Sequence, residues 1–421
     1  MKKPFFFYFL LGLIYLILFS FTACSSKTGN KIPTIGVAIY SYDDPFMQNI
    51  RSSIEANAAG KINLEIVNSQ NSQPMQNDQV DAFLSRKVDA MAICLVEQAA
   101  AASIIEKAKA RNVSVVFFTR EPSPEDMVSW DKVYYVSNKD EESGSMQGEI
   151  AFDYWMSHPS TDRNGDGILQ YIMLKGERDN KYTELRSEFS IRYLTDRGIK
   201  VECLAEYYAN WDQSIATEVM YTLSAAYDRV VEMIFCNNDY MALGAIEALK
   251  TFGYFQDGKF IPVLGIDGDP SALHALGKNT LLGTVLNDAD NLGKAVFDIA
   301  YALAAGANPA DSGWTITDGK YIWAPCRKIV LDPFPAPSFT RSSRLDYSMI
   351  GEQFLTIESL RIRSDASIDP SNIIKTIPIG TIVEIVDIGE VEVIDDITAP
   401  WALVKTQDGV IGWCFGGYLI N

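Results

Sequence analysis

The sequence predicts an α/β protein of two lobes, each a doubly wound parallel sheet, followed by a small all-β domain. Apolar strand patterns alternate with helical patterns from Ile32 to about Asp332, which is typical of parallel sheets covered by helices on both faces. The number of strand–helix units is larger than a single sheet usually contains, so two similar lobes are expected. After Asp332 short β-patterned runs with glycine-bearing turns replace the helical patterns and favour a small barrel.

The first 23 residues have the pattern of an export signal. Two lysines precede the apolar run Phe5–Leu18, and the small residue Ala23 precedes Cys24. This arrangement predicts cleavage before Cys24 and lipidation of that cysteine, with residues 24–31 as a polar tether. A retained membrane helix is the alternative, because the apolar run is long enough to span a bilayer. Either way, the remaining chain is expected outside the cytoplasm and tethered to a membrane.

The composition is that of an acidic globular protein. Hydrophobic residues make up 48% of the chain, and the formal net charge of −18 becomes −20 when Lys2 and Lys3 leave with the signal. Phosphate binding needs clustered lysine and arginine, so nucleic acid is not expected as a partner. The chain has only two histidines, which argues against a multi-histidine zinc site. Most other cysteines are expected to be free thiols, with one disulfide left open.

The strands and helices of the two lobes are expected in regular alternation along the chain. The strand patterns cover Thr34–Tyr40, Ile62–Asn68, Ala90–Leu95, Ser114–Phe118, Gln170–Lys175, Val201–Glu206, Val230–Phe235, Val263–Ile266 and Leu282–Leu286. The helix patterns cover Asp44–Ala59, Met75–Ser85, Ala99–Ala110, Gly144–Trp155, Thr183–Asp196, Asp212–Ala225, Tyr240–Thr251 and Asp288–Ala305.

Polar side chains follow several of the predicted strands. Asp44, Asn238, Asp267 and Asn287 each come just after a strand, where open α/β sheets bind their ligands. Aspartate and asparagine suit neutral hydroxyl groups, and the aromatic rings of residues 46 and 211 offer flat faces for a sugar ring. The simpler interpretation of each Asx residue is a helix N-cap. As a set, they predict a polyol or sugar cleft.

The segment from Asp162 to Gln170 has the spacing of a calcium loop. Oxygen donors alternate around the turn-forming glycine at position 165, as a hard cation requires. The closing glutamate of an EF-hand is missing, because Met173 stands at the twelfth position. A solvated Asx turn is the alternative. The donors available within the loop are Asp162, Asn164, Asp166, the carbonyl of Ile168 and the amide of Gln170.

From about Ile35 to Asp332 the chain resembles the periplasmic galactose/glucose-binding proteins. The motifs that carry the resemblance include Tyr42–Met47, Leu174–Glu177, Asn237–Asp239 and Gly283–Ala289. The resemblance implies a type I periplasmic binding protein, with two lobes joined by a three-strand hinge. It also implies a binding protein and not an enzyme, which closes on a monosaccharide and serves an ABC importer or a chemoreceptor. Chain crossings are expected near Ser137–Asn138, Leu286–Asn287 and Ile322–Trp323.

The resemblance assigns sugar contacts residue by residue. Polar contacts are expected from Asp44, Arg186, Asn238, Asp267 and Asn287, with Phe46 and Trp211 sandwiching the sugar ring. Three positions depart from the family pattern: Cys94 replaces an asparagine, Asn180 a histidine and Tyr182 an aspartate. Because paired polar groups decide which hydroxyls a site accepts, the identity of the sugar is left open.

The resemblance also supplies a closing ligand for the calcium loop. In the family a downstream glutamate completes the site, and Glu232 occupies the matching position. This residue stands in the otherwise apolar run Val230–Phe235, where a charge needs a partner. Calcium bound by the loop and Glu232 is therefore expected to stabilise the second lobe.

After residues 333–350, a Pro- and Ser-rich linker, residues 351–421 resemble a bacterial SH3 domain. The resemblance rests on Leu360–Ser364, the Pro-x-Gly-Thr turn at Pro378–Thr381, and the closing Gly417–Leu419. Such domains often contact cell-wall peptide, so peptidoglycan is a candidate partner. The aromatic residues Trp401, Trp413 and Tyr418 fit either the barrel core or a ligand surface.

The expected organisation and the alternative functions follow from these patterns. A transcriptional repressor of similar fold would need a basic helix-turn-helix where this chain has an export signal. A cell-wall hydrolase would suit the SH3-like module, but the sequence offers no nucleophile with a base. The expected boundaries are signal 1–23, tether 24–31, N-terminal lobe 32–138 and 287–322, C-terminal lobe 139–286 and 323–332, linker 333–350 and SH3-like domain 351–421.

Overall fold

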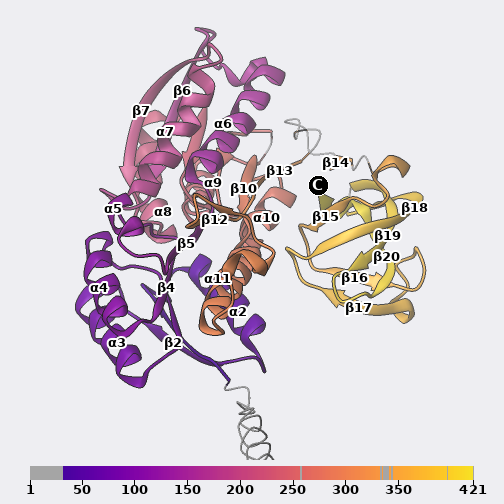
Figure 1. Cartoon of the computed structure of the whole chain (residues 1–421). Coiled ribbons are helices and arrows are strands. Elements are labelled where there is room, and N and C mark those ends of the chain that lie inside the picture. The colour runs from indigo at the N-terminus through magenta and orange to yellow at the C-terminus, as the bar shows by residue number, and fades with distance from the viewer. Residues whose placement is uncertain are drawn as a thin grey trace, which may run out of the picture.

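The computed structural model contains two α/β lobes and a separate all-β domain (Figure 1). It describes residues 32–256, 258–331, 334, 341–342, 345–395 and 397–420. The predicted signal, the predicted lipidation site Cys24, the tether and half of the predicted linker lie outside these residues. Within the described ranges, no helix combines the length and the apolar character needed to cross a membrane.

The N-terminal lobe is a seven-stranded sheet in the order β11-β12-β5-β4-β3-β1-β2. All neighbouring strands pair in parallel except β11 with β12. The strands are β1 Thr34–Ile39, β2 Asn63–Asn68, β3 Ala90–Ile93, β4 Ser114–Phe118, β5 Val133–Ser137, β11 Ile316–Thr317 and β12 Tyr321–Trp323. Two apolar clusters show that α2 (Pro45–Ala58) and α11 (Ala289–Ala304) cover one face, while α3 (Gln73–Arg86) and α4 (Ala101–Arg111) cover the other. The short helix α5 (Pro124–Val128) precedes β5.

The C-terminal lobe is a six-stranded sheet in the order β13-β10-β9-β8-β6-β7, in which only β13 runs antiparallel to its neighbour. Its strands are β6 Ile168–Lys175, β7 Lys200–Tyr208, β8 Met233–Cys236, β9 Val263–Leu264, β10 Gly283–Asn287 and β13 Cys326–Val330. The helices α6 (Asp140–Ser157) and α7 (Lys181–Thr195) pack on one face. The other face carries α8 (Gln213–Tyr227), α9 (Asp239–Thr251) and α10 (Pro270–Gly277).

The chain passes between the two sheets after β5, after β10 and after β12. Each passage leaves a strand of one lobe and continues in an element of the other: β5 leads to α6, β10 to α11, and β12 to β13. The fold class predicted from the sequence is therefore confirmed. The predicted strands and helices match observed ones with shifts at their ends, whereas α5, β5, α10 and the short strands β11 to β13 were not predicted. These elements are short or lie at sheet edges, where apolar periodicity is weak.

The third domain is an all-β sheet in the order β17-β16-β20-β19-β18-β15-β21, with β14 beside β19. Alternating burial gives it an apolar core of its own, which includes Ile362, Val383 and Val404. Trp401 is buried at 3% exposure and donates its Nε1–H to Glu392. The strands are β14 Arg341–Ser342, β15 Gln353–Thr356, β16 Leu360–Arg363, β17 Ile373–Ile377, β18 Ile382–Ile394, β19 Ile397–Thr406, β20 Ile411–Phe415 and β21 Leu419–Ile420.

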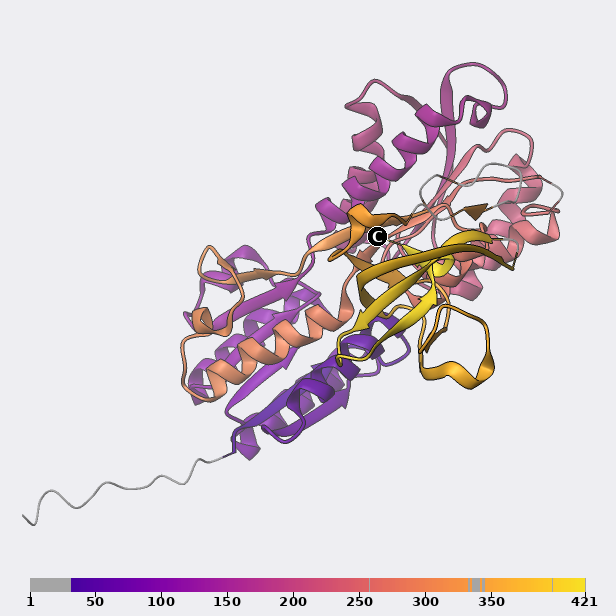
Figure 2. The ribbon, with the colours of Figure 1, turned by 90° about the vertical axis from the view of Figure 1, so that its right-hand side faces the viewer.

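This third domain packs against the C-terminal lobe (Figure 2). Leu355, Ile357 and Ile420 belong to the same buried cluster as Leu273 and Leu276 of α10. At the edge of this contact, Glu358 pairs with the His274 ring at 3.0 Å and with Lys278 at 3.6 Å. The domain is therefore attached to one lobe by an apolar contact and is not simply suspended from a linker.

Candidate functional site

A cavity of about 80 Å³ lies between the two lobes, at the carboxyl ends of their strands. The structure brings all of the predicted sugar-contact residues to this cavity except Asn287. That residue lies just behind it, where its amide donates to Asp267 at 3.1 Å. The lining residues are Tyr40, Asp44, Phe46, Met47, Thr119, Arg120, Ser137, Asn138, Asp140, Asn180, Tyr182, Arg186, Trp211, Asn238 and Asp267.

Three of the predicted polar residues are both helix caps and cavity residues. Asp44 accepts from the backbone N–H of Phe46 at the start of α2, Asn180 caps α7, and Asn238 caps α9. An Asx residue after a strand was expected to be either a cap or a contact, and here both descriptions hold. Capping holds each side chain in one rotamer at the end of a rigid helix. The polar atoms that the cap does not use are then held in fixed positions for a ligand.

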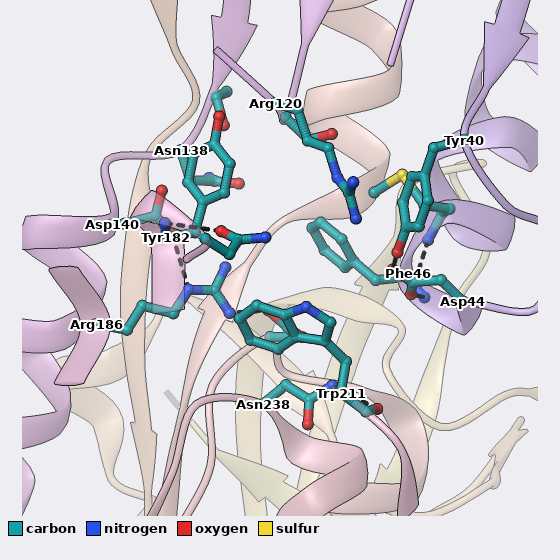
Figure 3. Close-up of a pocket in the computed structure, with 15 residues that line it drawn as sticks. Tyr40, Asp44, Phe46, Arg120, Asn138, Asp140, Tyr182, Arg186, Trp211 and Asn238 are labelled. Carbon is teal, nitrogen blue, oxygen red and sulfur yellow. Dashed lines mark hydrogen bonds and ion pairs between the residues drawn. The ribbon is translucent and has the colours of Figure 1, made fainter. Parts of the chain in front are cut away.

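Two aromatic rings reach into the cavity from opposite lobes (Figure 3). Phe46 stands in the first turn of α2, and Trp211 follows β7. The backbone of Trp211 is left-handed, with φ 63°, and its ring lies so close to Gly176 that a Cβ there would approach within 2.1 Å. Strained backbone of this kind persists only where the surrounding structure holds it. The glycine and the strain together fix the indole as one wall.

Arg186 is the charged centre of the C-terminal wall (Figure 3). Its guanidinium donates to Asp140 at 2.7 Å, to Asp267 at 3.2 Å and to the carbonyl of Asn237 at 2.8 Å. Burial acts to lower the pKa of Arg186, but the two carboxylates outweigh it and the pKa is raised. The guanidinium therefore stays charged in a buried place and holds the carboxylates in a fixed arrangement.

Two carboxyls line the cavity from opposite lobes, the partly exposed Asp44 and the buried Asp267. Burial raises the pKa of Asp267 to about 7, with a further contribution from the charge of Asp44 and opposition from Arg186. Burial also raises the pKa of Asp44, against the hydrogen bond that it accepts from the Tyr40 hydroxyl at 2.5 Å. Asp267 has a left-handed backbone, with φ 120°. Water hydrates these carboxyls only in part, so their oxygens are suited to accept hydrogen bonds from ligand hydroxyls.

Sequence reasoning did not single out Tyr40, Arg120 or Asp140 as cavity residues. Tyr40 directly follows β1 and Arg120 is the second residue after β4, so the rule of strand ends covers both. Asp140 lies in the first turn of α6, and only the fold brings it to Arg186. Of the three departures from the family pattern, Cys94 is fully buried outside the cavity lining, while Asn180 and Tyr182 line it. All five described cysteines, at 94, 203, 236, 326 and 414, are free thiols.

The predicted calcium loop leads into β6 and lies beside Glu232. The carboxylate of Glu232 is 1% exposed and accepts from the backbone N–H groups of Arg163 at 2.7 Å and Gln170 at 3.1 Å. Burial raises the pKa of Glu232, and the charges of Asp162 and Asp166 raise it further. The side-chain oxygen of Gln170 is buried without a hydrogen-bond partner. Among the described residues, no three His, Cys, Asp or Glu side chains converge closely enough to form a metal site alone.

Comparison with known proteins places the chain in a family. Residues 35–308 match the periplasmic binding protein domain, and residues 358–420 match the bacterial SH3 domain. A D-galactose/methyl-galactoside binding periplasmic protein of Haemophilus influenzae is 42% identical over 288 residues, which is 68% of this chain and 86% of that protein. A putative rhizopine-binding protein of Rhizobium meliloti is 28% identical over 66% of this chain and 87% of its own length.

Solved structures of solute-binding proteins share the fold. An ABC transporter solute-binding protein of Bacillus halodurans, with bound myo-inositol, has a TM-score of 0.59 at 23% identity and covers 72% of this chain and 96% of its own. One of Actinobacillus succinogenes, with bound D-allose, has a TM-score of 0.61 at 17% identity and covers 71% of this chain and 97% of its own. The chain belongs to the periplasmic binding protein family, is a homologue of a galactose-binding member, and ends in a bacterial SH3 domain.

Proposed function

We propose that the protein binds a monosaccharide of the glucose or galactose type in the cavity between its lobes and delivers it to an ABC importer. The observation that carries this proposal is that two aromatic side chains, Phe46 and Trp211, line the same cavity as the carboxyls of Asp44 and Asp267. Aromatic faces suit the C–H surface of a sugar ring, and fixed carboxyl and amide groups suit its hydroxyls. The named ligand of the Haemophilus relative, D-galactose or methyl-galactoside, supports the same class.

The mechanism that fits the fold is closure of the lobes on the sugar. The cavity residues come from both lobes, and the three chain passages join them at one side. A ligand that contacts both lobes favours the closed state by its difference in affinity for the two states. The named relatives are binding proteins, which supports binding without catalysis.

Calorimetry against hexoses, pentoses and nucleosides tests the proposed ligand class. We expect binding of one or more hexoses, with an affinity that falls when the ring hydroxyl pattern changes. Nucleosides should give no heat, because a cavity of about 80 Å³ is small for a base joined to a sugar. Binding of a nucleoside with no response to any hexose would contradict the proposal.

The loop at residues 162–170 is proposed as a structural calcium site. The donors would be Asp162, Asn164, Asp166, the carbonyl of Ile168, Gln170 and Glu232. The unpartnered oxygen of Gln170 supports this, because a buried acceptor without a donor is what a coordinated cation would satisfy. Bound Ca²⁺ would also offset the repulsion among the buried Glu232 and the two aspartates, so the second lobe would be more stable with the ion.

Thermal unfolding with calcium and with a chelator tests the calcium site. Calcium is expected to raise the melting temperature of the wild-type protein, and Glu232→Gln should weaken that rise. Asp78→Asn, an exposed position on α3, is the matched control and should respond like the wild type. An unchanged melting temperature after chelation, together with no heat on calcium titration, would contradict the proposed site.

The protein is further proposed to act outside the cytoplasm, anchored through a lipid on Cys24. The supporting observation is the signal pattern of residues 1–23, together with the periplasmic assignment of the Haemophilus relative. Mass spectrometry of the mature N-terminus would reveal diacylglyceryl-Cys24, whereas an intact residue 1 would favour a retained membrane helix. Presentation of the sugar to a chemoreceptor remains the alternative to delivery, and a binding assay with the permease would separate the two.

A further inference from the structure

Besides the hinge passages, the two lobes are joined by polar contacts at the edge of the cavity. One side is the loop after β4 in the N-terminal lobe, and the other is the loop after β6 with the first turn of α7 in the C-terminal lobe. None of these contacts involves a chain passage. The residues concerned, which we call the interlobe latch, are Arg120, Glu121, Glu177, Lys181 and Tyr182.

Arg120 provides the first contact of the latch. Its guanidinium is fixed on the N-terminal lobe, where it donates to the carbonyl of Val96 at 2.8 Å and lies 3.9 Å from the centre of the Tyr40 ring. From there it reaches Glu177 of the other lobe at 3.1 Å. The two side chains are only 15% and 30% exposed, so water screens this ion pair less than an ordinary surface pair.

Glu121 provides the second and third contacts. Its carboxylate accepts from Lys181 at 2.6 Å, and its backbone N–H donates to the Tyr182 hydroxyl. The Tyr182 hydroxyl also lies 3.4 Å from that of Tyr135. Glu121 itself is held on the N-terminal lobe, because Gln98 donates to its carbonyl at 2.9 Å. Both lobes therefore bring fixed groups to this edge.

We propose that the interlobe latch holds the lobes closed and sets how fast a bound sugar leaves. The inference rests on the proposed sugar-binding function. Tyr182 is then a positioning residue that joins the lobes, which explains why a phenol stands where the resembling family has a carboxylate. Opening of the lobes at this edge would break two ion pairs and the two hydrogen bonds of the Tyr182 hydroxyl, so weakening them should favour the open state.

Charge reversal of the Glu121–Lys181 pair tests the latch without changing the cavity lining. Neither side chain lines the cavity, and the two singles Glu121→Lys and Lys181→Glu each place like charges opposite one another. The double variant restores an ion pair of opposite orientation. The control is Lys107→Glu, whose partner Asp81 lies in the same lobe at 2.8 Å. The side chains of this control pair are 37% and 55% exposed, against 52% for Lys181 and 14% for Glu121.

Two measurements are needed, and Trp211 provides the signal for the first. Sugar release is followed by stopped-flow fluorescence, with the hexose that binds best in calorimetry. Lobe separation in the sugar-free protein is followed by small-angle X-ray scattering. We expect each single reversal to speed release about two- to fivefold, the range expected for a partly exposed ion pair, and to raise the radius of gyration. The double variant should recover both values, and Lys107→Glu should change neither.

The outcomes separate the latch from the proposed function. Equal release rates and equal scattering in all four latch proteins would overturn the latch while leaving sugar binding intact. Lower stability in the single variants, without recovery of release rate in the double variant, would also overturn it and assign a purely structural role. If the wild type binds no hexose, the proposed function fails, and the scattering of the sugar-free proteins still decides whether the pair holds the lobes together.

Discussion

Replacement of Asp267 by asparagine should change how the stability of the sugar-free protein depends on pH. Burial raises the pKa of this carboxyl from its ordinary value of 3.8 to about 7. The folded state therefore binds more protons than the unfolded state between these two values. In that window the unfolding free energy falls as pH rises, because ionisation of the buried carboxyl is easier once the chain unfolds.

The size of the effect follows from the two pKa values. Between about pH 5 and about pH 7, a group with this shift would lower the unfolding free energy by about 2 kcal/mol when taken alone. Asp267→Asn cannot titrate, so this part of the pH dependence should disappear. Arg186 keeps its pairing with Asp140 at 2.7 Å in that variant, so its charge remains compensated.

The measurement is urea unfolding of both proteins across this pH range, at a fixed calcium concentration and without sugar. The difference in unfolding free energy between wild type and Asp267→Asn should shift in favour of the variant by about 2 kcal/mol as pH rises. Asp78→Asn serves as the control, because its side chain is exposed on α3. A difference that stays constant between pH 5 and pH 7 would refute the assignment of a raised pKa to Asp267.

Three further predictions concern the cavity and the SH3 domain. Asp44→Ala should abolish sugar binding in calorimetry, whereas Asp288→Ala, which removes an equivalent cap from α11 outside the cavity lining, should retain it; binding by both would contradict the site. Ile357→Ala should cost about 2–4 kcal/mol at the fully buried contact with α10 and expose the SH3 domain to limited proteolysis, unlike Ile350→Ala at 45% exposure; equal cleavage would refute the apolar docking. If the SH3 domain binds cell wall, the full chain should be retained on peptidoglycan, and Trp413→Ala should lose that retention. Trp413 is the tryptophan to replace because its side chain is partly exposed, whereas Trp401 is buried. No retention of the wild type would rule out this partner.

The cavity residues that could be predicted from the sequence are those that come shortly after a parallel strand. Asp44, Asn238 and Asp267 were found because parallel strands bring their carboxyl ends to one edge, whatever the rest of the fold does. Asp140 could not be found in this way, since its role depends on Arg186, which lies 46 residues away in sequence and meets it only after α6 and α7 pack. The reach of Arg120 across the lobes likewise depends on how two separate sheets are oriented.

The fold was predictable to a similar extent and for similar physical reasons. Long helices such as α11 carry enough turns for their apolar face to be read from the sequence. The eight-residue helix α10 does not, although it forms the platform on which the SH3 domain packs. Residues 333–350 predicted only a linker between the lobes and the SH3 domain. The apolar contact of Ile357 with α10 could not be predicted, because it depends on a helix that forms part of the folded C-terminal lobe.

The attachment of the SH3 domain to α10 has a mechanical consequence. The first described strand, β1, lies in the N-terminal lobe, whereas the SH3 domain packs against the C-terminal lobe. Movement about the hinge must therefore change the distance between β1 and the SH3 domain. If both points are held, one at a membrane and one at a wall, tension between those two layers acts directly on the balance of open and closed lobes. The affinity for a small solute would then depend on the spacing of the cell envelope.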